Sequence, residues 1–145
     1  MKHLSLVLAV STALSIPLAA RPVVQSPKQT VSQAAVLGQW RGVMQATPAV
    51  DLTIKQNAGA VAGTIIFYRI DADSDGNPKV VGQDEMPLQD PIWKSGVLSF
   101  GVKRGETTVH FTMQPSGPAS AELRRVGAPA DEPPLPLTRT SKAAR

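Results

Sequence analysis

The feature that most constrains the fold of this chain is a tryptophan framed by two glycines, in the stretch Gly38-Gln39-Trp40-Arg41-Gly42, where a run of short alternating segments begins. In these segments apolar and polar residues alternate with a period of two, which is typical of strands with one face in a core and one in water. No stretch of useful length has the 3.6-residue period of an amphipathic helix. The sequence therefore predicts an all-β fold, in which Trp40 closes one end of a small barrel.

Turn residues divide the alternating region into consecutive hairpins. Asn57 and Gly59 tolerate positive φ and mark one turn, and Arg104-Gly105 marks another. Strands are expected over residues 50–55, 60–70, 97–102, 107–114 and 119–126, near Val80-Val81, and over residues 135–139 as a short edge strand. Consecutive hairpins form an up-and-down meander, which loses its exposed edges by closing on itself. We therefore expect a small antiparallel β-barrel of about eight strands over residues 36–140, with room for its own side chains or one small ligand.

The terminal segments are predicted to lie outside the barrel. Residues 1–20 have a short basic start, an uncharged stretch from Leu4 and a small-residue cleavage site at Ala19-Ala20, which indicates a secretory signal peptide. Residues 21–35 are polar and aperiodic and are interpreted as a disordered leader, and residues 141–145 as a disordered tail. After cleavage no segment is long and apolar enough to span a membrane. The predicted location is the periplasm or the extracellular medium.

Composition excludes several functional classes. The 145 residues contain no cysteine, which rules out disulfides, thiolate metal sites and a cysteine nucleophile. Small secreted domains often need disulfides, so their absence suggests a bacterial envelope protein whose β core is sufficient alone. Removal of Lys2 with the signal segment leaves 14 basic and 11 acidic residues, a net charge of +3. The densest basic pairs, Lys103-Arg104 and Arg124-Arg125, are interpreted as a hairpin tip and a strand end. They do not form the continuous basic stripe that nucleic-acid binding requires, so no nucleic-acid partner is expected.

Four short motifs carry a resemblance over residues 36–140. They are Gly38-Gln39-Trp40-Arg41-Gly42, Gly59-Ala60-Val61-Ala62-Gly63-Thr64, Leu98-Ser99-Phe100 and Pro136-Leu137-Thr138-Arg139. Together they resemble a group of bacterial secreted domains with a calycin-like, lipocalin-like small barrel. The resemblance implies that Trp40 packs across the closed end beneath Arg139, in a cation–π contact of about 0.5 to 2 kcal/mol. The chain is shorter than lipocalins and lacks their helix and disulfide, which argues against a roomy pocket.

One acidic stretch has the spacing of a metal-binding loop. In Asp71-Ala72-Asp73-Ser74-Asp75-Gly76, carboxylates at alternate positions precede a glycine, as in the first half of a calcium loop. The twelfth position is Gly82, where a bidentate glutamate is needed, and no helix pattern flanks the stretch. Two interpretations stay open: a weak calcium site formed by Asp71, Asp73 and Asp75, and a polar loop in which these residues make turns. No other cofactor is expected.

Candidate contact residues are few. Most aromatic residues are expected in the core, but Trp93 lies in a segment, residues 90–96, that reads as a loop, where it could cap the open end of the barrel or contact a partner. Tyr68 is the second candidate contact residue. His110, the only histidine after residue 20, falls on the outer face of a strand, so no catalytic triad is indicated and the chain is not expected to be an enzyme.

These observations favour a monomeric, non-catalytic module that binds a small apolar or amphiphilic ligand near residues 70–91. The alternative is a protein–protein interaction module, an inhibitor or envelope scaffold, that acts through the loops between residues 71 and 93. A cavity larger than about 300 Å³ would favour the ligand, whereas a filled interior with exposed loop aromatics would favour the protein partner. A third hypothesis, an extracellular hydrolase, requires His110 to lie in a cleft beside a nucleophile.

Overall fold

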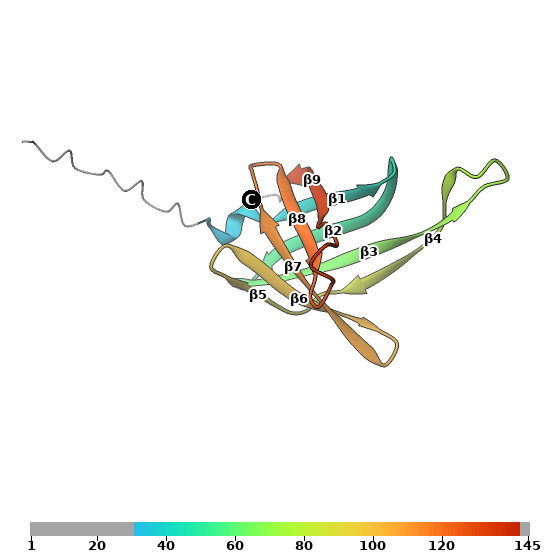
Figure 1. Ribbon diagram of the computed structural model, residues 1–145. Coiled ribbons are helices and arrows are strands. Elements are labelled where there is room, and N and C mark those ends of the chain that lie inside the picture. The colour runs from blue at the N-terminus through green and yellow to red at the C-terminus, as the bar shows by residue number, and fades with distance from the viewer. Residues whose placement is uncertain (1–30, 143–145) are drawn as a thin grey trace, which may run out of the picture.

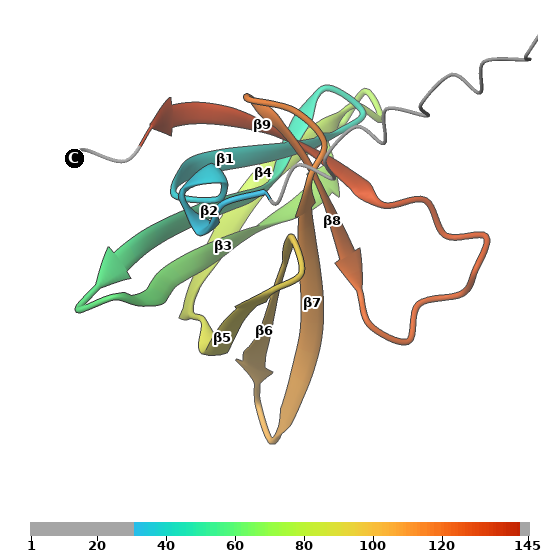
Figure 2. The same ribbon diagram turned by 90° about the vertical axis from the view of Figure 1, so that its left-hand side faces the viewer.

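The computed structural model describes residues 31–142, which form a short 3₁₀ helix, η1 (Gln33–Ala35), and nine strands in one antiparallel sheet (Figures 1 and 2). The strands are β1 (Gly38–Met44), β2 (Thr47–Asn57), β3 (Ala60–Ala72), β4 (Pro78–Pro87), β5 (Gln89–Lys94), β6 (Val97–Arg104), β7 (Thr107–Pro115), β8 (Ser120–Arg125) and β9 (Leu135–Lys142). The expected all-β class is confirmed. Within residues 31–142, no helix has the length and apolar character needed to cross a membrane.

The sheet is not the closed barrel that the sequence predicts. Its strand order is β4-β3-β2-β1-β9-β8-β7-β6-β5, so β4 and β5 are its two edges and do not pair. They follow one another along the chain with only Leu88 between them, whose N–H donates to the carbonyl oxygen of Gly63, 3.0 Å away. The chain therefore passes from the first half of the sheet, β1 to β4, into the second half, β5 to β9, without a turn, and β5 follows β4 end to end. Two segments joined in this way cannot lie side by side, and for this reason no ladder closes the sheet.

Strand β9 is also placed differently from the prediction of a short edge strand. It pairs with β1 on one side and β8 on the other, and so joins the first part of the chain to the last. Its register with β1 brings Arg139 opposite Trp40. Ser141 and Lys142 belong to this strand, because they pair with Gln39 and Gly38. The predicted disordered tail over residues 141–145 is therefore wrong for these two residues.

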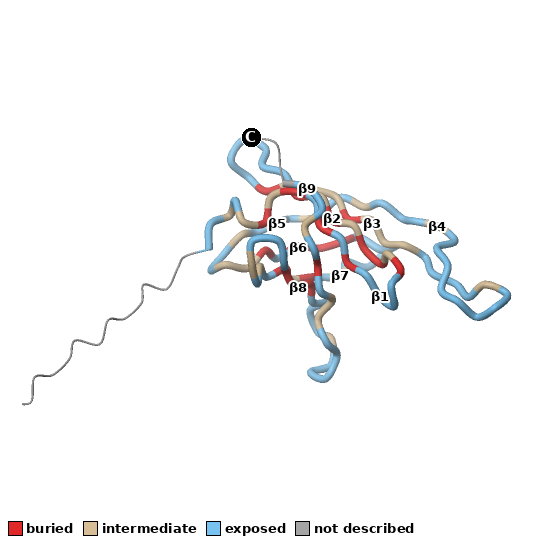
Figure 3. The backbone as a smooth tube through the Cα atoms, turned by 90° about the horizontal axis from the view of Figure 1, so that it is seen from above, coloured by how far each residue is buried: buried red, intermediate tan, exposed pale blue. Residues whose placement is uncertain are grey.

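The curved sheet packs its two halves against each other around one core. Most of the buried side chains come from the inward positions of β1 to β3 on one side and of β6 to β9 on the other, and Val36 and Leu88 add to them from outside the strands (Figure 3). Phe67 of β3 and Phe111 of β7 meet across the interior with ring centroids 5.8 Å apart, and Phe111 also stacks on Phe100 at 5.9 Å. The interior between the halves is thus filled by side chains over most of its length.

The curved sheet has two ends with different structures. Helix η1 covers one end, which we call the closed end, together with the turns β2–β3, β5–β6 and β7–β8. The turns β1–β2 and β6–β7, the β8–β9 loop and the β3–β4 hairpin lie at the other end, the open end, and this hairpin projects well beyond the body in Figure 1. The helix occupies part of the predicted leader, residues 21–35, so that prediction is wrong for residues 33–35. The predicted signal segment, residues 21–30 and residues 143–145 lie outside the described residues.

Candidate ligand-binding groove

A groove of about 560 Å³ lies at the open end, between the two halves of the sheet. Its lining is mostly apolar and combines inward-facing core residues with the β8–β9 loop. The lining residues are Val43, Met44, Val50, Phe67, Phe111, Leu123, Arg124, Arg125, Ala128, Glu132, Pro133, Pro134, Leu135 and Pro136. This volume lies within the range of small-molecule sites, about 300 to 1,000 Å³.

The apolar floor of the groove is the upper layer of the core. Phe67 and Phe111 occupy inward positions at the point where the sheet halves separate, and Val50 and Leu123 flank them. At the end of β1 a register shift after Gly42 interrupts the alternation, and Gln45 and Ala46 form the following turn with positive φ values of 49° and 63°. This irregular strand end leaves Met44 58% exposed at the rim.

The proline-rich loop between β8 and β9 forms the second wall. Prolines remove backbone donors and fix φ, so this segment does not pair as a strand. Two arginines at the end of β8 hold it: the Arg125 guanidinium lies 3.2 Å from the Glu132 carboxylate, and Arg124 donates to the backbone carbonyl of Glu132, also at 3.2 Å. The loop adds space above the strand ends without widening the sheet. For this reason the molecule has a groove of about 560 Å³, although its short strands argue against a roomy pocket.

Three inward rows of side chains end in arginine at the open end. In β3 the row runs through Ile65 and Phe67 to Arg69, because alternate residues of a strand share a face. In β6 the same alternation leads through Val102 to Arg104, and in β8 it leads through Leu123 to Arg125. The rows are apolar until the last position, which carries the charge.

The three arginines differ in their partners. The Arg104 guanidinium carbon lies 4.8 Å from the centroid of the Phe67 ring, and no ion pair of Arg104 is found among residues 31–142. Arg69 lies 3.9 Å from the carboxylate of Asp84, and its side chain is 65% exposed. Gly82, opposite Arg69 in the β3–β4 ladder, leaves the space that this guanidinium occupies. Arg125 is paired with Glu132, as described above.

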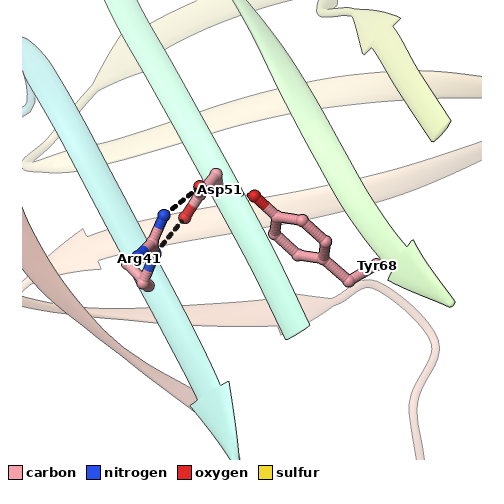
Figure 4. A network of polar contacts seen from close by, with 3 residues as sticks. All are labelled: Arg41, Asp51 and Tyr68. Carbon is pink, nitrogen blue, oxygen red and sulfur yellow. Dashed lines mark hydrogen bonds and ion pairs between the residues drawn. The ribbon is translucent and has the colours of Figure 1, made fainter. Parts of the chain in front are cut away.

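A polar network lies on the outer face of β1, β2 and β3 (Figure 4). Arg41 donates to both carboxylate oxygens of Asp51, at 2.7 and 2.6 Å, and the Tyr68 hydroxyl donates to Oδ2 at 2.8 Å. These hydrogen bonds, first that from Arg41, lower the pKa of Asp51. The bond to Asp51 in turn raises the pKa of Tyr68. The network fastens three strands together on the side that faces away from the groove.

The two predicted contact residues do not line the groove. Tyr68 faces outward in the network, and its neighbour Phe67 is the aromatic residue that enters the groove. Trp93 is in strand β5 and not in a loop; it is partly buried against the core. The β5–β6 turn that follows Trp93 approaches Val31 beside η1, so Trp93 lies towards the closed end and does not cap the open one.

The acidic residues of the predicted calcium loop do not gather around a common centre. Strand β3 continues to Ala72, so Asp71 is part of a strand and lies opposite Lys79 of β4. Asp73 accepts hydrogen bonds from the backbone N–H groups of Asp75 and Asn77, at 2.9 and 2.8 Å, which lower its pKa and form the hairpin tip. Among the described residues, no group of three or more potential ligands is placed to hold a metal ion. The structure thus matches the turn interpretation.

His110 is exposed on the outer face of β7, opposite Gly101 of β6. Its backbone carbonyl accepts a hydrogen bond from Val126 at 2.8 Å, at the start of the β8–β9 loop. His110 is not among the residues that line the groove at the open end. The protein–protein hypothesis presents Trp93 and the acidic residues 71–75 to one partner. The structure separates them, because Trp93 lies towards the closed end and the tip of the β3–β4 hairpin lies at the open end.

The closed end is filled by Trp40 and held by Arg139. Trp40 is 1% exposed, its indole N–H donates to the carbonyl oxygen of Val36 at 2.8 Å, and the Arg139 guanidinium carbon lies 4.3 Å from its ring centroid. Arg139 also donates to the carbonyl oxygens of Leu37, at 2.7 Å, and Ala35. The contact that the resemblance implies for this pair is present. It serves the fold, since both side chains hold η1 over the end of the sheet.

A wider hollow of about 990 Å³ lies beside η1, but its lining is of another kind. It includes Gln39, Thr53 and Lys55, which occupy outward positions of β1 and β2, so much of it lies on the outside of the sheet. The groove at the open end reaches the core rings of Phe67 and Phe111, whereas this hollow touches the buried core at Ile54 alone and has no aromatic residue in its lining. The groove is therefore the better candidate site.

No known protein family, curated protein or solved structure gives a significant match to this chain. The residues that sequence reasoning missed are Arg69, Arg104 and Arg125 as a group. The available signal was an inward row of apolar residues followed, two positions later, by arginine in three different strands.

Proposed function

We propose that this chain is a non-catalytic binding protein that holds a small apolar or amphiphilic ligand in the groove at the open end. The observation that carries this proposal is the groove itself, about 560 Å³ in volume and lined by apolar side chains from both halves of the sheet. Apolar pockets of this size with a few polar groups at their margin are typical of small-molecule sites. The calycin-like kinship and a periplasmic or secreted location, which rests on residues 1–20, are part of the same proposal.

The test uses Nile red, an uncharged apolar dye whose fluorescence rises on binding. Met44→Glu places a charge at the rim of the groove, where the native side chain is 58% exposed, so the fold should tolerate it. Ile92→Glu is the matched control, because Ile92 is 60% exposed on β5 and does not line the groove. We expect the Kd for Nile red to rise at least about fivefold in Met44→Glu, because the bound apolar dye would meet a charge. Equal affinities in both variants, or no binding by the native chain, would overturn the proposal.

A protein partner is the second candidate, favoured by the projecting β3–β4 hairpin. Its residues Ile70, Val80 and Val81 are exposed by 39, 37 and 58%, more apolar surface than a hairpin without a partner needs. Native mass spectrometry of the protein purified from its own cells separates the two candidates. A retained small molecule supports the groove, and a retained protein that Val81→Lys releases supports the hairpin.

A further inference from the structure

The opening of the groove, which we call the mouth, carries positive charge, and this charge favours an anionic ligand. Its floor is apolar, and the side chains that follow the floor residues on the inward rows of β3, β6 and β8 are Arg69, Arg104 and Arg125. The Phe67 and Phe111 rings are neighbours at 5.8 Å; Arg104 covers the Phe67 ring, and Arg125 lies opposite Phe111 in the β7–β8 ladder. Cationic groups thus stand on both sides of the aromatic pair.

The carboxylates at this mouth neutralise it only in part. Glu132 pairs with Arg125, and Asp84 lies 3.9 Å from Arg69, at the limit of an ion pair. Arg104 has an aromatic ring beneath it and no ion pair among the described residues. A cation–π contact with the Phe67 ring uses none of the N–H donors of Arg104, which stay available to a ligand. The mouth therefore offers hydrogen-bond donors and positive charge directly above an apolar floor.

We propose that the ligand is a single-chain amphiphile with an anionic headgroup, whose tail lies in the groove and whose headgroup is bound by Arg104 and Arg125. This inference rests on the proposed function and adds the charge of the headgroup. An arginine fork binds a carboxylate, sulfate or phosphate oxygen pair in a bidentate manner, and such bonds are the stronger class of hydrogen bond. Glu132 holds Arg125 until the headgroup competes for it.

Three probes with the same tail and different headgroups test the charge directly: dodecanoate and dodecyltrimethylammonium, each titrated below its micellar concentration, and dodecanol, titrated below its solubility limit. We expect dodecanoate to bind at least about tenfold more tightly than dodecanol, and the cation to bind most weakly. The preference for dodecanoate should decrease at high salt, because the mouth is exposed. Acetate, the same headgroup without a tail, should not bind measurably.

Variants of the mouth locate the preference. Arg104→Gln should raise the Kd of dodecanoate about tenfold and leave that of dodecanol unchanged. Arg125→Gln should weaken dodecanoate more than dodecanol, because Arg125 also holds the β8–β9 loop that walls the groove. Lys103→Gln is the matched control, because Lys103 precedes Arg104 but occupies an outward position, and it should change neither value. Glu132→Gln should lower the Kd of dodecanoate about threefold, since it releases Arg125 from an exposed ion pair.

The outcomes separate this inference from the function on which it rests. Equal binding of dodecanoate and dodecanol would overturn the inference and leave the apolar groove supported. Binding of acetate as tight as that of dodecanoate would also overturn it, because the site would then be a simple anion site. If none of the three tails binds, the proposed function itself is wrong.

Discussion

Trp40 and Arg41 are neighbours in sequence that serve opposite faces of the sheet. The Trp40 ring faces inward, beneath Arg139, whereas Arg41 faces outward and forms a bidentate pair with Asp51. The two arginines have different partners: Arg139 contacts the Trp40 ring and backbone carbonyls at the closed end, and Arg41 contacts a carboxylate on the outer surface. Strand alternation alone explains this division.

Replacing Asp51 should give a pH-dependent loss of stability. The folded-state pKa of Asp51 is lowered, first by the hydrogen bond from Arg41, so its contribution is fully present above the ordinary carboxyl pKa of about 4 and is lost as the pH falls through the lower folded value. Arg41 is 44% exposed, so solvent screening limits the contribution to about 1 kcal/mol. Asp51→Asn should lower the free energy of unfolding by that amount at about pH 7, and the deficit should shrink towards about pH 2.

Urea unfolding at a series of pH values measures this difference. Asp131→Asn, in the exposed β8–β9 loop, serves as the control, because no hydrogen bond or ion pair is found for its side chain among the described residues. A deficit of the same size at every pH would show that the Asp51 charge is not what stabilises the three strands.

At the scale of elements, η1 depends on contacts that come from the opposite end of the sequence. The helix has only three residues, too few to be stable alone. Arg139 of β9 binds the carbonyl oxygens of Ala35 and Leu37, and Trp40 of β1 binds that of Val36, so two strands hold one short helix. The closed end exists because β9 lies beside β1.

Arg139→Gln should therefore destabilise the fold by about 2 kcal/mol, through loss of the ring contact and of charge-assisted hydrogen bonds. The same change should increase the exposure of Trp40, which shifts its fluorescence to longer wavelength. Lys55→Gln, an exposed position of β2 close to the same end, is the control and should change neither property. Unchanged emission together with full stability would mean that η1 is held without Arg139.

At the scale of the whole molecule, the two halves of the sheet share one core although their edges do not pair. Phe111 of β7 contacts both Phe67 from the first half and Phe100 from the second. The chain also crosses between the halves without a turn at Leu88, and β9 joins them on the far side. We expect the halves to unfold together.

Phe111→Ala should lower the free energy of unfolding by about 3 to 5 kcal/mol, the usual range for a buried phenylalanine. The transition should stay single. In a Trp93→Phe background, the emission of Trp40 reports on the packing of the closed end, and far-ultraviolet circular dichroism reports on all strands; both should give the same midpoint. Two separate midpoints would show that the halves are independent units.

The local alternation of apolar and polar residues was sufficient to predict most strands and the inward position of Trp40, because strand alternation and turn residues act over a few positions. The same local signals fail at residues 86–96, where Leu88 joins β4 to β5 without a recognisable turn and the prediction of a loop around Trp93 is wrong. They also placed the contact residues at Tyr68 and Trp93, since aromatic side chains are conspicuous in a sequence.

Arg69, Arg104 and Arg125 are separated by 35 and 21 positions, and nothing local shows that all three lie at the same end of the sheet. By itself the sequence determined which residues face inward and where most turns fall. Only the tertiary structure decided that the sheet stays open between β4 and β5, and that Arg125 lines an apolar groove at the open end with Arg104 over its Phe67 ring. These features depend on strand order and register, which are set by the packing of one shared core and not by the preferences of any single segment.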